Sequence, residues 1–293
     1  METKIREFCE YRKEKKQVSA NTVAAYRSDL QRLASYLQTN RIASLEQVTE
    51  TNLNSFILYA EREGLKASSI VRLISTIHNF FDFLTKKGYI KEDPSERIKA
   101  PKAEFAAQEI ISVEELERLL EVPDTDTPGG LRDKAMLEVL YATGMHLSTL
   151  LQIKLSELQL PYNAILVNES GTNRVLPLGG PACDALRAYL ENGRPHFCEK
   201  AKDKELLFYN KSGEQMTRQG FFKKITEYAK AAQLPNITPR ILRNSMITHL
   251  MNNGASYAGV HQLLGTKRLS AAMNYQRQTG SIPEIYRTAH PRA

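Results

Sequence analysis

Hydrophobic side chains in the first hundred residues recur at steps of three and four positions, the spacing of one face of an α-helix. One such run spans residues 23–37, a second spans 53–60 and a third spans 70–84. The third ends at Lys86, Lys87 and Gly88, a basic last turn followed by glycine. With a short helix before them, these runs predict an N-terminal bundle of four or five helices.

The pattern changes after Asp93 and Pro94. Residues 101–108 are poor in hydrophobic side chains and predict a linker. Two short hydrophobic runs on either side of a Ser170-Gly171-Thr172 turn predict a pair of strands. Helical periodicity covers most of the remaining chain, over residues 112–121, 131–151, 181–192, 217–232, 239–253, 256–264 and 268–278. The fold class predicted is mainly α, with a helical domain at 1–100, a linker at 101–108, and a mostly α domain with a small sheet at 109–293.

The charge distribution favours a polyanionic partner. The net charge is +7, and by count residues 1–102 hold 18 Lys and Arg against 13 Asp and Glu, so they carry +5 of it. A basic N-terminal third suits DNA, the commonest large polyanion, although a solvated charged face is the simpler alternative.

Other kinds of chemistry lack their signatures. The chain has no GxxxxGK[ST] loop, no GxGxxG after a predicted strand and no HExxH, and its six histidines show no metal-ligand spacing. No cofactor or metal is therefore expected. Three cysteines without a CxxC pair, and an N-terminus without the apolar core of a secretory signal, favour the cytoplasm. No apolar run approaches the roughly 20 residues of a membrane span, so no membrane partner is expected.

Eight segments resemble, in order and spacing, those of the tyrosine recombinase (phage integrase) family of the XerC and XerD type. They are residues 18–30 and 69–84, the one region that holds the pairs Asp93-Pro94 and Pro101-Lys102, and then 131–144, 174–179, 217–221, 238–243 and 263–275. The resemblance covers nearly the whole chain. It implies a SAM-like core-binding domain followed by a domain of the recombinase catalytic type, together binding duplex DNA.

The resemblance also implies a reaction. In that family a tyrosine attacks a DNA phosphate, forms a 3′-phosphotyrosyl link and frees a 5′-hydroxyl. Two arginines and histidine-type donors surround the phosphate, and a lysine on the hairpin turn protonates the leaving oxygen. Electrostatic and general-acid contacts of this kind are each commonly worth a factor of about 10² to 10³ in rate.

The matching positions of this chain depart from that set. The kept positions are Tyr275 (the nucleophile) and Arg243; the substituted ones are His146 for the first arginine, Glu169 for the hairpin lysine, and Arg240 and Thr266 for the two histidines. No lysine lies between Ser156 and Pro195, so a small alignment shift does not recover the acid. Neither His146 nor Arg240 supplies a bidentate arginine fork at the first position.

The surviving residues have more than one interpretation. Arg240 and Arg243 are three residues apart, hence on one helical face, and are interpreted as a phosphate clamp rather than as a surface ion pair. Tyr275 is either a nucleophile or a packing aromatic. Further DNA contacts are expected at Arg27, Arg72, Asn79, Arg218, Lys267 and Arg268.

The function predicted is sequence-specific binding of double-stranded DNA without catalysis, as a phage or mobile-element repressor or an architectural factor. The alternative is an active site-specific recombinase that cuts DNA through Tyr275. A helical protein-interaction module is a third class. A homodimer or homotetramer on DNA is considered, and the sequence identifies no small-molecule or peptide regulator.

Overall fold

The computed structural model describes residues 1–15, 18–101, 109–169, 172–265 and 282–293. It divides into two compact units, Met1–Ala106 and Ala107–Ala293, each with its own hydrophobic core. The predicted linker at 101–108 lies outside the described residues except for Pro101. Within the described ranges, no helix combines the length and apolar character that crossing a membrane requires.

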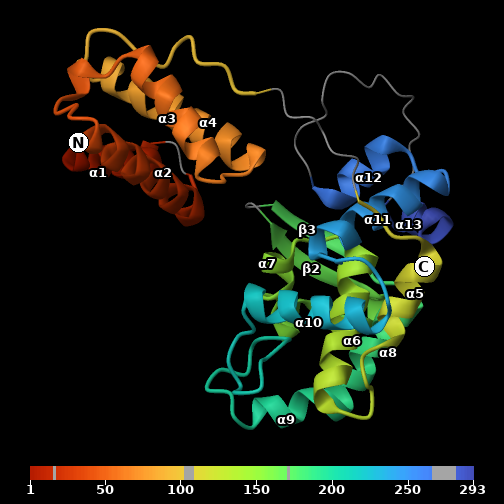
Figure 1. The fold of residues 1–293 in the computed structure, drawn as a ribbon. Coiled ribbons are helices and arrows are strands. Elements are labelled where there is room, and N and C mark those ends of the chain that lie inside the picture. The colour runs from red at the N-terminus through yellow and green to blue at the C-terminus, as the bar shows by residue number, and fades with distance from the viewer. Residues whose placement is uncertain (16–17, 102–108, 170–171, 266–281) are drawn as a thin grey trace. The chain divides into compact units, whose positions relative to one another are not determined.

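The first unit is a helical bundle (Figure 1). Its elements are α1 (Glu2–Lys15), α2 (Ala20–Thr39), a 3-10 turn (Leu45–Gln47), α3 (Glu50–Arg62) and α4 (Ala67–Lys86). Ser19 caps α2 by accepting a hydrogen bond from the Thr22 amide, which satisfies one of the free N–H groups at a helix start. The three predicted hydrophobic runs supply the buried faces of α2, α3 and α4, so this part of the fold prediction is confirmed.

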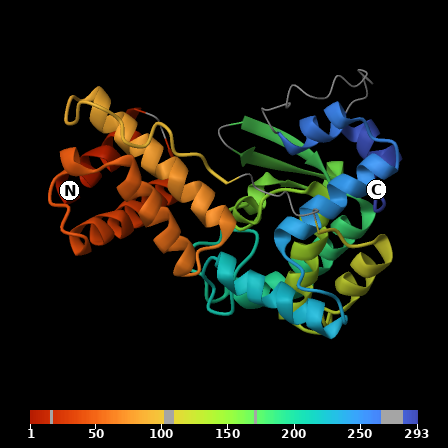
Figure 2. The same ribbon diagram turned by 45° about the horizontal axis from the view of Figure 1, so that its top comes forward.

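The second unit is mostly helical with one small sheet (Figures 1 and 2). Its helices are α5 (Val113–Glu121), α6 (Pro128–Thr143), α7 (Leu147–Leu150), α8 (Gly180–Ala188), α9 (Arg194–Cys198), α10 (Arg218–Ala231), α11 (Pro239–Asn252), α12 (Tyr257–Leu264) and α13 (Ile282–Ala289). A π-helical turn (Tyr189–Gly193) joins α8 to α9. The predicted final helix at 268–278 lies outside the described residues.

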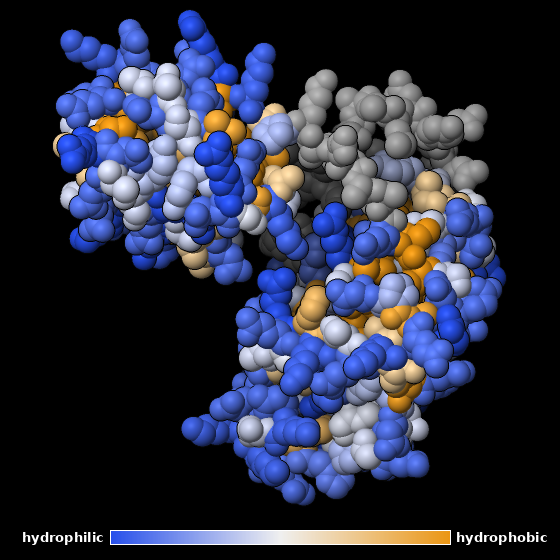
Figure 3. Space-filling model, in the orientation of Figure 1, coloured by the Kyte–Doolittle hydropathy of each residue, from blue (hydrophilic) through white to orange (hydrophobic). Residues whose placement is uncertain are grey.

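The central element of this unit is α6. Its residues from Ala135 to Thr143 are all buried, and α5, α8 and α11 pack around it. Most of these side chains are apolar and they face every side of the helix, so the stretch lies in a core, where its one charged residue, Glu138, is paired with Arg292. Hydrophilic side chains cover much of the outer face of the unit in Figure 3.

The sheet has the antiparallel order β1-β2-β3, with β1 at Leu158–Gln159, β2 at Ala164–Glu169 and β3 at Thr172–Pro177. Along β2, Ile165 and Val167 are buried while Leu166 is exposed, because successive side chains in a strand point to opposite faces. The predicted strand pair is confirmed. Strand β1, only two residues long, was not predicted, since so short a stretch shows no alternation.

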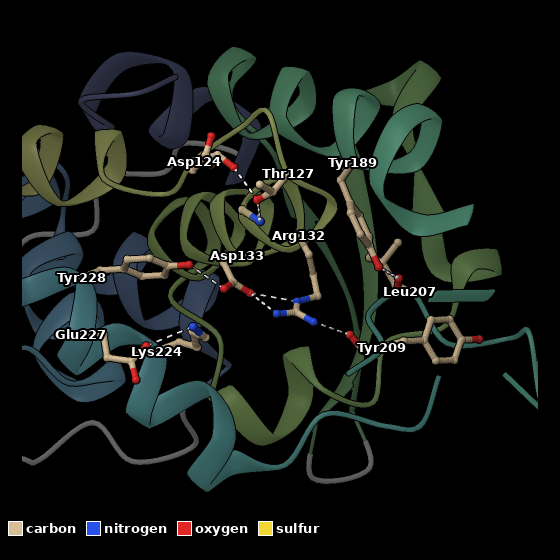
Figure 4. Close-up of polar contacts among 11 residues, drawn as sticks. Asp124, Thr127, Arg132, Asp133, Tyr189, Leu207, Tyr209, Lys224, Glu227 and Tyr228 are labelled. Atoms are coloured by element: carbon tan, nitrogen blue, oxygen red, sulfur yellow. Dashed lines mark hydrogen bonds and ion pairs between the residues drawn. The ribbon is translucent and has the colours of Figure 1, made fainter. Parts of the chain in front are cut away.

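A buried polar network fixes the start of α6 (Figure 4). Arg132 forms an ion pair with Asp133 at 2.7 Å and donates to the Tyr209 carbonyl at 2.9 Å. The second carboxylate oxygen of Asp133 accepts from the Tyr228 hydroxyl at 2.6 Å. Burial, and the bond from the hydroxyl to Asp133, raise the pKa of Tyr228. The network joins α6, α10 and the segment after α9.

Candidate nucleic-acid interface

The end of α6 and the start of α7 hold the first substituted position. Gly144 ends α6 in the left-handed conformation, with φ of +59°. This left-handed backbone favours glycine, and a Cβ there would also lie 2.0 Å from the Met246 side chain, whose flexible end would have to shift. His146 follows as the N-cap of α7, and its side chain is exposed. The chain thus presents His146 directly beside the point where α6 meets α11.

Helix α11 carries two of the predicted arginines. It begins with Thr238, which accepts from the Ile241 amide, and Pro239 in the first turn. Arg240 is exposed in that first turn, and Arg243 is half-buried about one turn further on. The Arg243 guanidinium donates to the carbonyl of Gly144. The structure therefore brings Arg243 to the α6–α7 junction that carries His146.

The β2–β3 hairpin and the end of α12 meet at the same junction. Arg174 on β3 donates to the Leu263 carbonyl in the last turn of α12. Gly265 ends α12 with φ of +65°, and a Cβ there would lie 2.6 Å from the Arg174 guanidinium carbon. The Leu264 side chain lies 3.1 Å from the Cβ position of Gly144. The hairpin, α12 and the end of α6 are therefore connected through direct contacts.

The remaining positions of the predicted catalytic set are described only in part. Glu169 is the last residue of β2, and the structure describes its backbone pairing with Thr172. Thr266 and Tyr275, and the predicted DNA contacts Lys267 and Arg268, lie outside the described residues. The sequence analysis includes Arg174 only as the first residue of the matched segment 174–179. Its contact with α12, 89 residues away, left no local signal in the sequence.

Of the predicted contacts in the first unit, two make long-range bonds inside the bundle. Arg72 of α4 forms an ion pair with the buried Asp29 of α2, whose carboxylate also accepts from Thr76 at 3.0 Å. Asn79 accepts from Arg12 of α1 at 2.5 Å. Their roles in DNA binding stay predictions, as does that of the exposed Arg27 on α2.

In the second unit, the predicted contact Arg218 is exposed at the start of α10. No cluster of three His, Cys, Asp or Glu side chains suited to a metal occurs among the residues that the structure describes. The junction instead offers guanidinium groups and the start of α11. Each guanidinium carries a full positive charge, and the dipole of α11 adds a partial positive charge at its start. Such a set can bind a phosphate oxygen.

This chain belongs to the phage integrase family, the tyrosine recombinases. The family's catalytic-domain profile, "Phage integrase family", matches residues 109–281, and "Phage integrase, N-terminal SAM-like domain" matches residues 5–88. The predicted resemblance and fold class are confirmed.

Curated relatives match along almost the full length. The chain is 36% identical over 293 residues to tyrosine recombinase XerD of Listeria innocua, covering 99% of both chains. It is 35% identical to XerD of Staphylococcus haemolyticus, covering all of both, and 33% identical to XerC of Roseiflexus castenholzii, covering 94% of this chain and 88% of that one.

Solved structures show the same fold at lower identity. The XerH site-specific recombinase in a post-cleavage complex with its palindromic difH substrate superposes with a TM-score of 0.72 at 20% identity, covering 90% of this chain and 77% of that one. The Tn1549 transposon integrase in complex with circular intermediate DNA gives 0.72 at 18% identity, covering 94% and 96%.

Proposed function

We propose that this chain binds duplex DNA through a recombinase fold and does not cleave it. This proposal rests on which residues occupy the predicted phosphate site in the described part of the chain. There Arg243 alone keeps the family residue, while the matching positions carry His146, Glu169 and Arg240. One arginine that can hold a phosphate is retained, whereas the first arginine, the hairpin lysine that acts as the acid and the first histidine are all replaced.

Retention of binding is supported by the α6–α11 junction. Arg243 and Arg240 add two positive charges at the start of α11, and each can donate to a phosphate oxygen. The relatives solved with DNA are tyrosine recombinases of the same fold, which supports double-stranded DNA as the partner. Phosphate contacts of this kind make affinity fall steeply with salt.

Loss of cleavage is supported by the hairpin position. A lysine there would donate a proton to the leaving 5′-oxygen, whereas a glutamate with the ordinary pKa of its type is a carboxylate at neutral pH and has no proton to give. Its charge would also repel the phosphate. A regulatory role, as a repressor or an architectural factor of a phage or mobile element, follows from this loss and stays a prediction.

The second candidate is an active site-specific recombinase. The names of the curated relatives favour it, because proteins 33% to 36% identical over nearly the whole chain are tyrosine recombinases. The chain also keeps Tyr275 at the nucleophile position. The two candidates share DNA binding and differ in one product, a covalent protein–DNA adduct.

The experiment that separates them uses a suicide substrate. Genomic fragments retained by the protein identify a binding site, and duplexes nicked near that site then trap any phosphotyrosyl intermediate. Denaturing gels are run for the natural chain and for Tyr275→Phe. We expect tight, salt-dependent binding and no adduct in either protein.

An adduct present in the natural chain and lost in Tyr275→Phe would establish cleavage and select the second candidate. Absence of salt-sensitive binding to any duplex would reject both candidates. That result would favour the third class, a protein-interaction module.

A further inference from the structure

Arg174 is an arginine for which the predicted site has no role. It lies on β3 and is half-buried, and its guanidinium rests against Gly265, where α12 ends. One N–H donates to the Leu263 carbonyl. Figures 1 and 2 both show α12 beside the β2–β3 hairpin, in agreement with this bond.

The setting of Arg174 matches that of Arg243. Each guanidinium donates to a main-chain carbonyl at the C-terminal end of a helix, Gly144 for Arg243 and Leu263 for Arg174. Each helix ends in a left-handed glycine. A carbonyl contact orients the planar guanidinium, which has five N–H donors and can serve a second acceptor.

The two arginines belong to one junction. Leu264 follows the residue that receives the Arg174 bond, and its side chain lies against Gly144, whose carbonyl receives the Arg243 bond. Three adjacent contacts therefore connect the two guanidinium groups. His146, at the position where the family has its first arginine, is two residues beyond Gly144.

We propose that Arg174 is a further DNA-binding residue, which contacts a backbone phosphate at the same junction as Arg243. The proposal rests on the proposed DNA binding and adds one specific cation to it. The rival interpretation is that Arg174 only caps α12, because a cation at a helix C-terminus is stabilising by itself. The two interpretations differ in whether the positive charge of Arg174 is neutralised by DNA.

Salt dependence measures that difference. Each phosphate neutralised adds about 0.9 to the slope of log affinity against log salt concentration. The full-length chain is titrated with a fluorescent duplex of about 30 base pairs of mixed sequence, because non-specific binding isolates the phosphate contacts. We expect Arg174→Gln to lower the slope by about 0.9 and Arg174→Lys, which keeps the charge, to preserve it.

The matched control is Arg187→Gln, an exposed arginine of α8 in the same unit, paired with Asp184 at 2.8 Å. Its slope should equal that of the natural chain. An unchanged slope for a folded Arg174→Gln would overturn the proposal and leave Arg174 as a helix cap. Failure of the natural chain to bind the duplex would instead reject the proposed function itself.

A second measurement needs no variant at residue 174, in case Arg174→Gln fails to fold. The natural chain is treated with an arginine-specific dicarbonyl reagent with and without the same duplex, and modification is read by mass spectrometry. We expect DNA to protect Arg174 several-fold and to leave Arg187 unprotected. Equal modification of Arg174 with and without bound DNA would contradict the proposal.

Discussion

Arg240 occupies a position that disfavours a cation in the free protein. It lies in the first turn of α11, where the partial charge of the helix is positive. A cation there costs about 0.3 to 1 kcal/mol, which a bound phosphate would offset. We therefore expect Arg240→Gln to raise the free energy of unfolding by that amount and to weaken DNA binding. Urea unfolding and the duplex titration measure the two effects.

Arg118→Gln is the control for this pair of effects. Arg118 is exposed in the last turn of α5, where the helix charge favours a cation. Its loss should lower the free energy of unfolding slightly and leave DNA binding unchanged. If Arg240→Gln destabilised the free protein as Arg118→Gln does, Arg240 would be structural and the clamp interpretation would be wrong.

His290 makes stability depend on pH. It is buried against Tyr141, Tyr286 and His249, with Arg292 nearby, and burial lowers its pKa from 6.5 to about 4. As pH falls, the unfolded chain therefore takes up this proton before the folded one. The neutral His290 therefore stabilises the folded protein fully above about pH 6.5, and this stabilisation is lost by about pH 4. The free energy of unfolding decreases by roughly 3 kcal/mol over that interval. Burial also lowers the pKa of His249, which adds a decrease of the same sign.

Urea unfolding at several pH values between 4 and 7 measures this dependence. His290→Asn keeps an acceptor for the Arg292 amide and removes the titrating group. We expect its stability curve to be flatter than that of the natural chain over this interval. His196→Asn, at an exposed site on α9, should leave the curve as it is. Parallel curves for the natural chain and His290→Asn would exclude His290 as the source.

At the scale of single elements, periodicity predicted most of the fold and few of the contacts that complete the site. The buried faces of α2, α3 and α4 follow from spacing alone, since it depends on residues three and four apart. The Arg72–Asp29 pair joins residues 43 apart, and Arg243 reaches a carbonyl 99 residues away. Such partners depend on how the helices pack, which no local pattern contains.

The C-terminal segment is held on its own domain by similar long-range contacts. The Tyr286 hydroxyl accepts from the Gly179 amide at 3.0 Å, and Arg292 binds both carboxylate oxygens of the buried Glu138, at 3.1 and 2.7 Å. The main chain passes so close to Gly179 that a Cβ there would lie 1.7 Å from the Arg292 carbonyl oxygen. Glycine at 179 is therefore a condition for this docking.

We expect Gly179→Ala to displace residues 286–293 and to raise their amide hydrogen exchange at least several-fold. Gly180→Ala is the matched control, because a Cβ at the next position meets nothing within 4 Å. Hydrogen exchange with mass spectrometry compares the two variants. Equal protection of the segment in both would show that it does not dock at Gly179 in solution.

At the scale of the whole molecule, the chain has the family fold, while the residues that we propose for its phosphate site differ from the family's catalytic set. Both family domains are present, and the predicted positions His146, Arg240 and Arg243 lie on two segments that meet at Gly144. The sequence therefore identified both family domains, and the substitutions that it assigns to the motif positions stay a prediction. It did not indicate Arg174, whose approach to Gly265 exists only in the folded unit.

This difference makes a gain of function the most demanding test of the proposed inactivity. If the framework is intact, restoring the four family residues together (His146→Arg, Glu169→Lys, Arg240→His and Thr266→His) should produce an adduct on the nicked substrate. Contacts of this kind act as a unit, so single reversions should yield little, although each is worth on the order of 10² to 10³ in the complete set.

Adding Tyr275→Phe to the restored protein is the control, and the adduct should then disappear. A restored protein that folds and binds DNA without forming an adduct would mean that the loss of cleavage extends beyond these four positions, into the geometry of the junction itself. The natural chain is run on the same gel. An adduct from the restored protein alone would show that the framework lost only its reactive groups. No adduct from either protein would show a framework that does not hold a phosphate in line for attack.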